Sequence, residues 1–366
     1  MQIDKLTYRG VRTRAALLPL ARPVVARVGE FREWPVILID LETEEGITGT
    51  SYLEPYLANS VKYIIPAIHD LIERRKGEVI APANDFYTHR KMLNLIGLQG
   101  VATIAVSGID MAAWDALSKA ANMPLARFLG GSTDPIPAYN SNGLWLTPID
   151  TLEQEAAELK EEGDFGALKL RIGRECLNDD LGALEAVRKG AGSDIKLMCD
   201  FNQGQTIGEA LSRCHALDDS GLYWFEEPIP YDQLPGYTQL ARELKTPVQL
   251  GENFYGPRSL FEAVAAEAGD YMMPDLMRIG GVTGWLHAAS IAGSAGVPIS
   301  SHLYPEFSAH LLAVTETAHW LEWQDWVNPI LQEPFKLSNG TLTIPEMAGA
   351  GIQWDDLIVK KFEMDI

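Results

Sequence analysis

The chain has 366 residues, with 30 Lys and Arg against 50 Asp and Glu, and its formal net charge is −20 at pH 7. At about 150 residues per domain, this length predicts two domains and a large hydrophobic core. The acidic excess argues against nucleic-acid binding, which needs a basic face, and against docking to an anionic membrane.

The three cysteines, Cys176, Cys199 and Cys214, are too few and odd in number for a disulfide framework. We therefore expect buried free thiols in a protein of the reducing cytoplasm. The first ten residues, MQIDKLTYRG, show no signal-peptide pattern. No stretch is long and apolar enough to predict a transmembrane helix.

The first part of the chain, to about residue 125, mixes strands and helices. Residues 35–40 and 47–53 read as two strands joined by a turn. Residues 101–121 carry apolar side chains at helical spacing. Pro124 then opens a short second helix.

From residue 136 onward, short β-rich runs recur about every 25 residues. Helical patterns, for example over residues 150–163 and 179–188, separate most of them. Eight strands with intervening helices predict a (β/α)8-type barrel, whose active site lies at the C-terminal strand ends. The runs cover residues 136–141, 166–171, 195–200, 222–227, 247–252, 271–275, 297–302 and 318–323.

Three of these strands end in carboxylates that follow one another at intervals of 26 residues, namely Asp200, Glu226 and Glu252. The equal spacing predicts similar heights on successive strands. Three converging carboxylates do not all stay ionised without a cation. Oxygen ligands suit a hard ion, so we predict a Mg²⁺ site.

His302 and Asp275 end two adjacent strands, which predicts an imidazole base oriented by a carboxylate. Glu322 ends the last strand among apolar neighbours, and these favour a neutral carboxyl that donates to an oxyanion. The alternative for Glu322 is an ion pair with a neighbouring Lys or Arg. The glycines after Arg278 match no phosphate motif and read as a strand-to-helix turn.

At this point the motifs resemble the enolase superfamily, and within it the mandelate racemase subgroup, over nearly the full chain. The resemblance implies an N-terminal α+β capping domain (1–128), a modified (β/α)7β barrel of the TIM type (129–328) and a C-terminal segment returning to the cap (329–366). It also implies a homo-oligomer, an octamer. The motifs are VILIDL (36–41), SGIDMAAWDAL (107–117), KLRIG (169–173), FEEP (225–228), GEN (251–253), MRIGGVTGW (277–285), SSHL (300–303), SAHLLA (308–313) and TAHWLE (317–322).

The resemblance further implies a chemistry, in which Mg²⁺ on the three carboxylates binds a substrate carboxylate and stabilises an enediolate after α-proton abstraction. His302 with Asp275 is the expected base, Lys169 neutralises the carboxylate and Glu322 donates to the second oxyanion. The implied substrate contacts are Ser141, Asn202, Val24, Phe31 and Tyr56.

The sequence departs from the racemase pattern at Arg171, where the subgroup has a second lysine that serves as base for the opposite face. A guanidinium stays charged and is a poor base. One-base chemistry by His302 remains, which predicts dehydration of an acid sugar or hydroxy diacid, with Arg171 as an electrostatic clamp. The alternative is a racemase of a mandelate-like 2-hydroxy acid, and a remote alternative is a non-catalytic binding protein.

A flap around residues 21–34 is expected to be a loop over the barrel mouth that sets specificity. Val24 and Phe31 give it an apolar component. Gln324 stands where an aryl pocket would favour an aliphatic residue. These features predict a small carboxylate more polar than mandelate, unless the flap charges face solvent. The flap charges are Arg22, Arg27, Glu30, Arg32 and Glu33.

Overall fold

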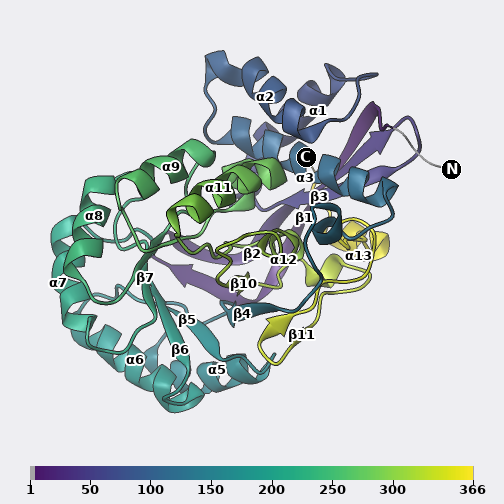
Figure 1. The fold of residues 1–366 in the computed structure, drawn as a ribbon. Coiled ribbons are helices and arrows are strands. Elements are labelled where there is room, and N and C mark those ends of the chain that lie inside the picture. Colours follow the sequence, from purple (N-terminus) through teal and green to yellow (C-terminus); the bar gives the residue numbers. More distant parts are fainter. Residues whose placement is uncertain (1–4, 366) are drawn as a thin grey trace.

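The structure is a computed structural model that describes residues 5–365, and it contains a cap and a barrel (Figure 1). Residues 1–4 and 366, which belong to the expected cap and C-terminal segment, lie outside the described residues. The cap holds an antiparallel sheet in the order β1-β2-β3, covered by helices. Its elements are β1 (Tyr8–Ala26), β2 (Gly29–Thr43), β3 (Thr48–Leu53), η1 (Ala58–Ser60), α1 (Val61–Glu73), α2 (Pro82–Leu93), η2 (Asn94–Ile96), α3 (Val101–Ala120) and α4 (Leu125–Phe128).

The barrel follows, with parallel strands in chain order from β4 to β9 and with β10 pairing β4. All five residues of β5 are buried, as expected for strands covered on both faces. The barrel elements are β4 (Ile136–Asn140), α5 (Ile149–Glu161), β5 (Ala167–Arg171), α6 (Leu177–Ala191), β6 (Lys196–Asp200), α7 (Ile207–Leu217), β7 (Trp224–Glu226), α8 (Leu234–Glu243), β8 (Val248–Leu250), α9 (Pro257–Ala265), β9 (Tyr271–Met272), α10 (Leu276–Ile279), α11 (Gly281–Ala295), α12 (Pro305–Leu312) and β10 (Leu321–Trp323).

One expected barrel strand differs from the prediction, because residues 297–302 do not form a regular strand. Isolated bridges join Ile299 to Met272 and to Ala318, and another joins His302 to Asp275. These bridges close the barrel between β9 and β10. The barrel with an N-terminal cap is therefore confirmed, with an irregular seventh position that carries His302.

The C-terminal segment contains η3 (Asn328–Ile330), β11 (Leu337–Ser338), β12 (Thr341–Leu342) and α13 (Asp356–Phe362). It first extends the barrel, since β12 pairs antiparallel with β4. It then reaches the cap, where the Met364 N–H donates to the Ala15 carbonyl at 2.8 Å. The segment is thus attached both to the barrel and to the cap, which it also meets where the Leu125 N–H donates to the Gly349 carbonyl at 2.8 Å.

Two of the three cysteines are buried, Cys199 and Cys214, whereas Cys176 is exposed, contrary to the expectation of buried thiols. Among the described residues, no helix combines the length and apolar character needed to cross a membrane.

His310 on α12 supports an acid-stability prediction. Its Nδ1 accepts from the Ala126 N–H at 3.0 Å, and burial lowers its pKa to about 4 although its bond to the Ala350 carbonyl opposes this. In the unfolded chain this histidine is protonated below about pH 6.5, whereas in the folded protein it stays neutral down to about pH 4. The free energy of unfolding therefore falls as pH falls between these values, by about 3 kcal/mol over the whole interval.

We expect urea unfolding of His310→Asn to lose less stability between pH 7 and pH 4.5 than the wild type loses. His69→Asn, at an exposed histidine, is the matched control and should keep the wild-type dependence. Equal losses in wild type and His310→Asn would contradict the prediction.

Candidate active site

The C-terminal ends of the barrel strands bring the predicted charged residues together. Arg171, Asp200 and Glu226 stand in register across β5, β6 and β7. Glu252 lies two residues beyond the end of β8. Parallel strands end at one rim of a barrel, so these side chains converge on the same space.

The three carboxylates fit a divalent cation. Asp200, Glu226 and Glu252 each offer an oxygen, and these atoms lie within 4.8 Å of one another. Burial, aided by the charge of Asp200, raises the pKa of Glu226 to about 8 even with Lys169 beside it. A cation among the three would favour their ionised forms. An all-oxygen set that leaves room for other ligands suits Mg²⁺.

Lys169 is buried at the centre of this cluster. Its Nζ lies 2.6 Å from Glu226 Oε1 and 3.6 Å from Asp200 Oδ2. Burial alone would lower its pKa, but the surrounding carboxylates outweigh burial and raise it. Lys169 is therefore held as a cation.

Glu322 also contacts Lys169, which corrects the expectation of a neutral carboxyl. Its Oε1 lies 2.8 Å from Lys169 Nζ, and its Oε2 accepts from the Leu303 N–H at 2.9 Å. Burial would raise its pKa, yet the charges of Lys169 and His302 lower it. The ion-pair alternative is the one that the structure contains.

His302 and Asp275 form the expected pair. His302 Nδ1 lies 2.8 Å from Asp275 Oδ2, and His302 Nε2 lies 3.4 Å from Glu252 Oε2. Burial lowers the His302 pKa, but Glu252 and the hydrogen bond with Asp275 raise it to about 9. A cation held near Glu252 would offset that rise in the pKa. Because Nδ1 is engaged by Asp275, Nε2 is the ring nitrogen available for proton transfer.

Arg171 is fixed by backbone carbonyls and by an aromatic ring. Nη1 donates to the Ser141 and Gly143 carbonyls at 3.0 and 3.2 Å, and Nη2 donates to Ser141 Oγ at 2.8 Å. Its guanidinium carbon lies 3.8 Å from the Trp145 ring centre. Ser141, an expected substrate contact, stands outside the cavity lining and holds Arg171 instead.

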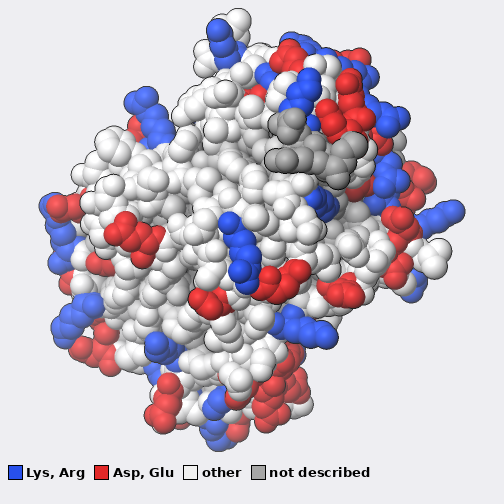
Figure 2. All heavy atoms as spheres, turned by 45° about the vertical axis from the view of Figure 1, so that its right-hand side comes forward, with Lys and Arg blue, Asp and Glu red and all other residues white. Residues whose placement is uncertain are grey.

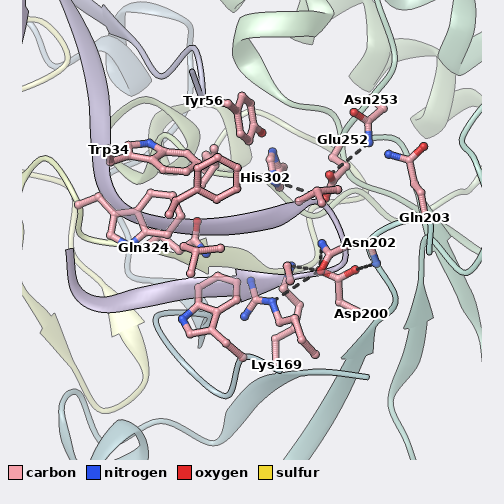
Figure 3. Close-up of a pocket in the computed structure, with 18 of the residues that line it drawn as sticks. Trp34, Tyr56, Lys169, Asp200, Asn202, Gln203, Glu252, Asn253, His302 and Gln324 are labelled. Atoms are coloured by element: carbon pink, nitrogen blue, oxygen red, sulfur yellow. Dashed lines mark hydrogen bonds and ion pairs between the residues drawn. The ribbon is translucent and has the colours of Figure 1, made fainter. Parts of the chain in front are cut away.

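A cavity of about 260 Å³ opens beside these groups (Figure 3). Asn202, an expected substrate contact, lines it, and its Nδ2 donates to Asp200 Oδ2 at 2.9 Å. The polar lining residues are Lys169, Arg171, Asp200, Asn202, Gln203, Glu252, Asn253, Arg278, His302 and Gln324.

The rest of the cavity lining is apolar and aromatic. It includes three expected substrate contacts, Val24, Phe31 and Tyr56. The ring centres of Trp34 and Trp326 lie 4.3 Å apart. The apolar and aromatic lining residues are Val24, Ala26, Val28, Phe31, Trp34, Tyr56, Trp145, Leu303 and Trp326.

The flap is the end of the β1–β2 hairpin, not a loop, since Val24 pairs with Phe31 and Ala26 with Gly29. Its charged side chains are absent from the cavity lining. Arg22 Nη2 lies 2.6 Å from Glu162 Oε1, and Arg32 Nη2 lies 2.7 Å from Glu30 Oε1. The flap charges therefore give no reason to expect a polar substrate.

Several lining residues were missed by sequence reasoning. Arg278 was assigned to a turn, yet its Nη1 donates to the Glu252 carbonyl at 2.8 Å and its guanidinium carbon lies 4.7 Å from the Tyr56 ring centre. Arg278 follows Asp275 by three residues, about one helical turn, and this spacing could have indicated that it lies near Asp275 at the barrel mouth. Trp34, Trp145 and Trp326 come from distant segments, and no local pattern links them.

Comparisons with known proteins agree with this geometry. Residues 8–130 match the mandelate racemase / muconate lactonizing enzyme N-terminal domain, and residues 151–358 match the enolase C-terminal domain-like family. L-talarate/galactarate dehydratase of Salmonella typhimurium is 30% identical over 93% of this chain and 87% of its own.

Two solved structures extend the comparison. An enolase from the alpha proteobacterium BAL199 with bound Mg has a TM-score of 0.96 and 51% identity, over 98% of this chain and all of its own. An enolase from Bradyrhizobium, complexed with magnesium and mandelic acid, has a TM-score of 0.94 and 38% identity, over 99% of this chain and all of its own. Other relatives include further acid-sugar dehydratases and racemases.

Proposed function

The chain belongs to the mandelate racemase / muconate lactonizing enzyme family of the enolase superfamily, whose members are Mg²⁺-dependent enzymes, and we propose that it dehydrates a 2,3-dihydroxycarboxylate. The observation that carries this proposal is the asymmetry of the cavity. Its lining contains one imidazole, that of His302, which is paired with Asp275, and a guanidinium, that of Arg171, in place of a second base. Only the imidazole can take up a proton near neutral pH.

The steps follow from these positions. Bound Mg²⁺ supplies the positive charge that a substrate carboxylate needs as its α-proton leaves. His302 Nε2 takes the α-proton, and Asp275 holds the other ring nitrogen. The same Nε2 then returns the proton to the 3-hydroxyl, which departs as water while the C–O bond breaks. The remaining enol tautomerises to a 2-keto-3-deoxy acid.

Lys169 and Glu322 take modified roles in this proposal. Lys169 helps to neutralise the substrate carboxylate, because it lines the cavity and remains charged. Glu322 keeps Lys169 in place by their 2.8 Å contact.

The proposal is tested by incubating the Mg²⁺-loaded protein with acid sugars and assaying 2-keto-3-deoxy products. Mandelate racemisation without any keto product would overturn it.

Arg171→Lys should lower the dehydration rate about tenfold or more, because lysine lacks the planar fork that holds two carbonyls and the Trp145 ring. Steady-state kinetics of keto-acid formation measures the effect. Arg188→Lys is the matched control, since Arg188 also donates to several backbone carbonyls, away from the cavity. Efficient racemisation by Arg171→Lys, with dehydration unchanged, would contradict the assigned role.

The second candidate function is a 2-hydroxycarboxylate racemase, and the apolar and aromatic lining residues favour it. They suit an aryl or alkyl substituent, and the Bradyrhizobium relative holds mandelic acid. A racemase must also move a proton on the face opposite His302, which would require Arg171 to exchange protons. Inversion of mandelate-type acids at rates above any dehydration would support this alternative.

We also propose a cytoplasmic homo-oligomer, an octamer by resemblance. In the view of Figure 2, charged residues are interspersed and leave a broad uncharged area. On the cap, Leu95 is 99% exposed and Ile96 is 81% exposed, and apolar residues this exposed favour contact with another subunit. Sedimentation velocity tests the proposal, because a monomer at micromolar concentration would overturn it.

A further inference from the structure

Trp224 on β7 lies in the barrel interior, in a buried cluster with Tyr139, Ala167 and Met198 from the neighbouring strands. It precedes Glu226 by two residues, and residues at this spacing on a strand face the same side. Its indole Nε1 donates to Glu226 Oε2 at 3.0 Å, and both side chains are fully buried. One oxygen of a carboxylate at the barrel mouth is thus tied to a ring deeper in the barrel.

The other contacts of the Glu226 carboxylate leave Trp224 as the main partner of Oε2. Lys169 Nζ lies 2.6 Å from Oε1, and Gln249 Nε2 reaches Oε2 only at the longer distance of 3.5 Å. An indole N–H donates without carrying charge, so it holds the oxygen and leaves the charge of the cluster unchanged. Hydrogen bonds of this kind orient the side chains that ligate a metal, and their loss typically costs about 10- to 100-fold in metal affinity.

We infer that Trp224 is a positioning residue of the Mg²⁺ site, and that it acts by holding Glu226 through its indole N–H. The inference rests on the assignment of Mg²⁺ to the three carboxylates that include Glu226. Trp224 is absent from the cavity lining, so its effect must pass through the carboxylate. The competing explanation is that Trp224 only fills space, since its ring packs edge-on against Tyr139 with the ring centres 5.4 Å apart.

The experiment measures the Mg²⁺ dissociation constant by calorimetry, in the absence of substrate. Trp224→Phe keeps an aromatic ring and removes the donor, so Mg²⁺ should bind about 10- to 100-fold more weakly than to the wild type. Trp285→Phe is the matched control, because Trp285 is equally buried and its Nε1 donates to Thr315 Oγ1 at 3.1 Å, away from the cavity. This control also loses a buried indole and a hydrogen bond, yet it should keep the wild-type affinity.

A second substitution separates the N–H from the size of the ring. Replacing Trp224 with benzothienylalanine keeps a fused ring of similar shape and puts sulfur in the place of the N–H. This protein should also bind Mg²⁺ about tenfold more weakly or worse. It provides the test if Trp224→Phe does not fold, and circular dichroism verifies the folding of each variant.

Wild-type Mg²⁺ affinity in the benzothienylalanine protein would overturn the inference, because packing alone would then explain any loss in Trp224→Phe. Equal weakening in Trp224→Phe and Trp285→Phe would overturn it as well, since the effect would follow from general destabilisation.

Glu226→Gln distinguishes failure of this inference from failure of the site on which it rests. Loss of Mg²⁺ binding in Glu226→Gln, together with wild-type affinity in both Trp224 variants, would overturn the role of Trp224 alone. Wild-type affinity in Glu226→Gln would overturn the ligand assignment and the inference with it. The proposed dehydration is tested separately, because no substrate enters these measurements.

Discussion

His302→Asn should lower the rate of α-proton exchange about 10³-fold, within the range that general bases contribute. His302 Nε2 is the expected proton acceptor, and Asn offers no basic nitrogen in its place. The measurement is deuterium incorporation at the α-carbon, followed by NMR in deuterated water with Mg²⁺ and a hydroxy acid that the wild type exchanges.

The control for this variant is a histidine in a similar pair outside the barrel mouth. His215 Nε2 lies 3.2 Å from Glu243 Oε2 on the surface, so His215→Asn should exchange at the wild-type rate. Calorimetric Mg²⁺ binding to His302→Asn establishes that the site is intact. Exchange by His302→Asn within about threefold of wild type, far from the expected loss, would place the base elsewhere.

Lys169→Met should lower the free energy of unfolding by about 3–5 kcal/mol in the presence of a chelator, because removing one member of a buried ion cluster leaves uncompensated charge. Lys169 is 1% exposed and contacts Glu226, Glu322 and Asp200. Mg²⁺ should restore part of the loss, by about 2.7 kcal/mol at a hundred times its dissociation constant. Urea unfolding with and without Mg²⁺ measures both effects.

Lys189→Met tests whether the loss depends on burial. Lys189 Nζ lies 2.6 Å from Glu153 Oε2, the same distance as in the Lys169–Glu226 pair, but both partners are exposed. Surface pairs contribute little, so this variant should unfold nearly as the wild type does. A Lys169→Met protein as stable as Lys189→Met in chelator would show that the buried carboxylates need no lysine.

The cluster of Asp200, Glu226 and Glu252 was predictable because its sequence signal is local. Each carboxylate follows an apolar run of its own at the C-terminal end of a barrel strand. The predicted equal height holds for Asp200 and Glu226 but not for Glu252, because Glu226 pairs with Gln249 and Glu252 lies three residues further on. Asp200 and Glu226 indeed stand opposite each other in the sheet. The same reasoning placed His302 beside Asp275, even though residues 297–302 form only bridges in place of a strand.

The charge state of Glu322 was not predictable from its neighbours in the chain. Apolar residues on either side favoured a neutral carboxyl, but its ionisation depends on Lys169, which reaches it from β5, separated from β10 by β4. The prediction drawn from the flap charges was wrong for a related reason. In a hairpin, alternate side chains face opposite sides, so a count of charges could not show that the charged side chains lie outside the cavity lining, whereas Val24 and Phe31 line it as expected.

Whether His302 acts as a single base is tested most directly by α-deuterium incorporation into each C2 epimer of a 2,3-dihydroxycarboxylate, measured with Mg²⁺ and after chelation. We expect exchange and keto-acid formation from one configuration at C2, loss of both on chelation and recovery on adding Mg²⁺. Exchange from both configurations with inversion, or exchange that persists in chelator, would contradict this expectation.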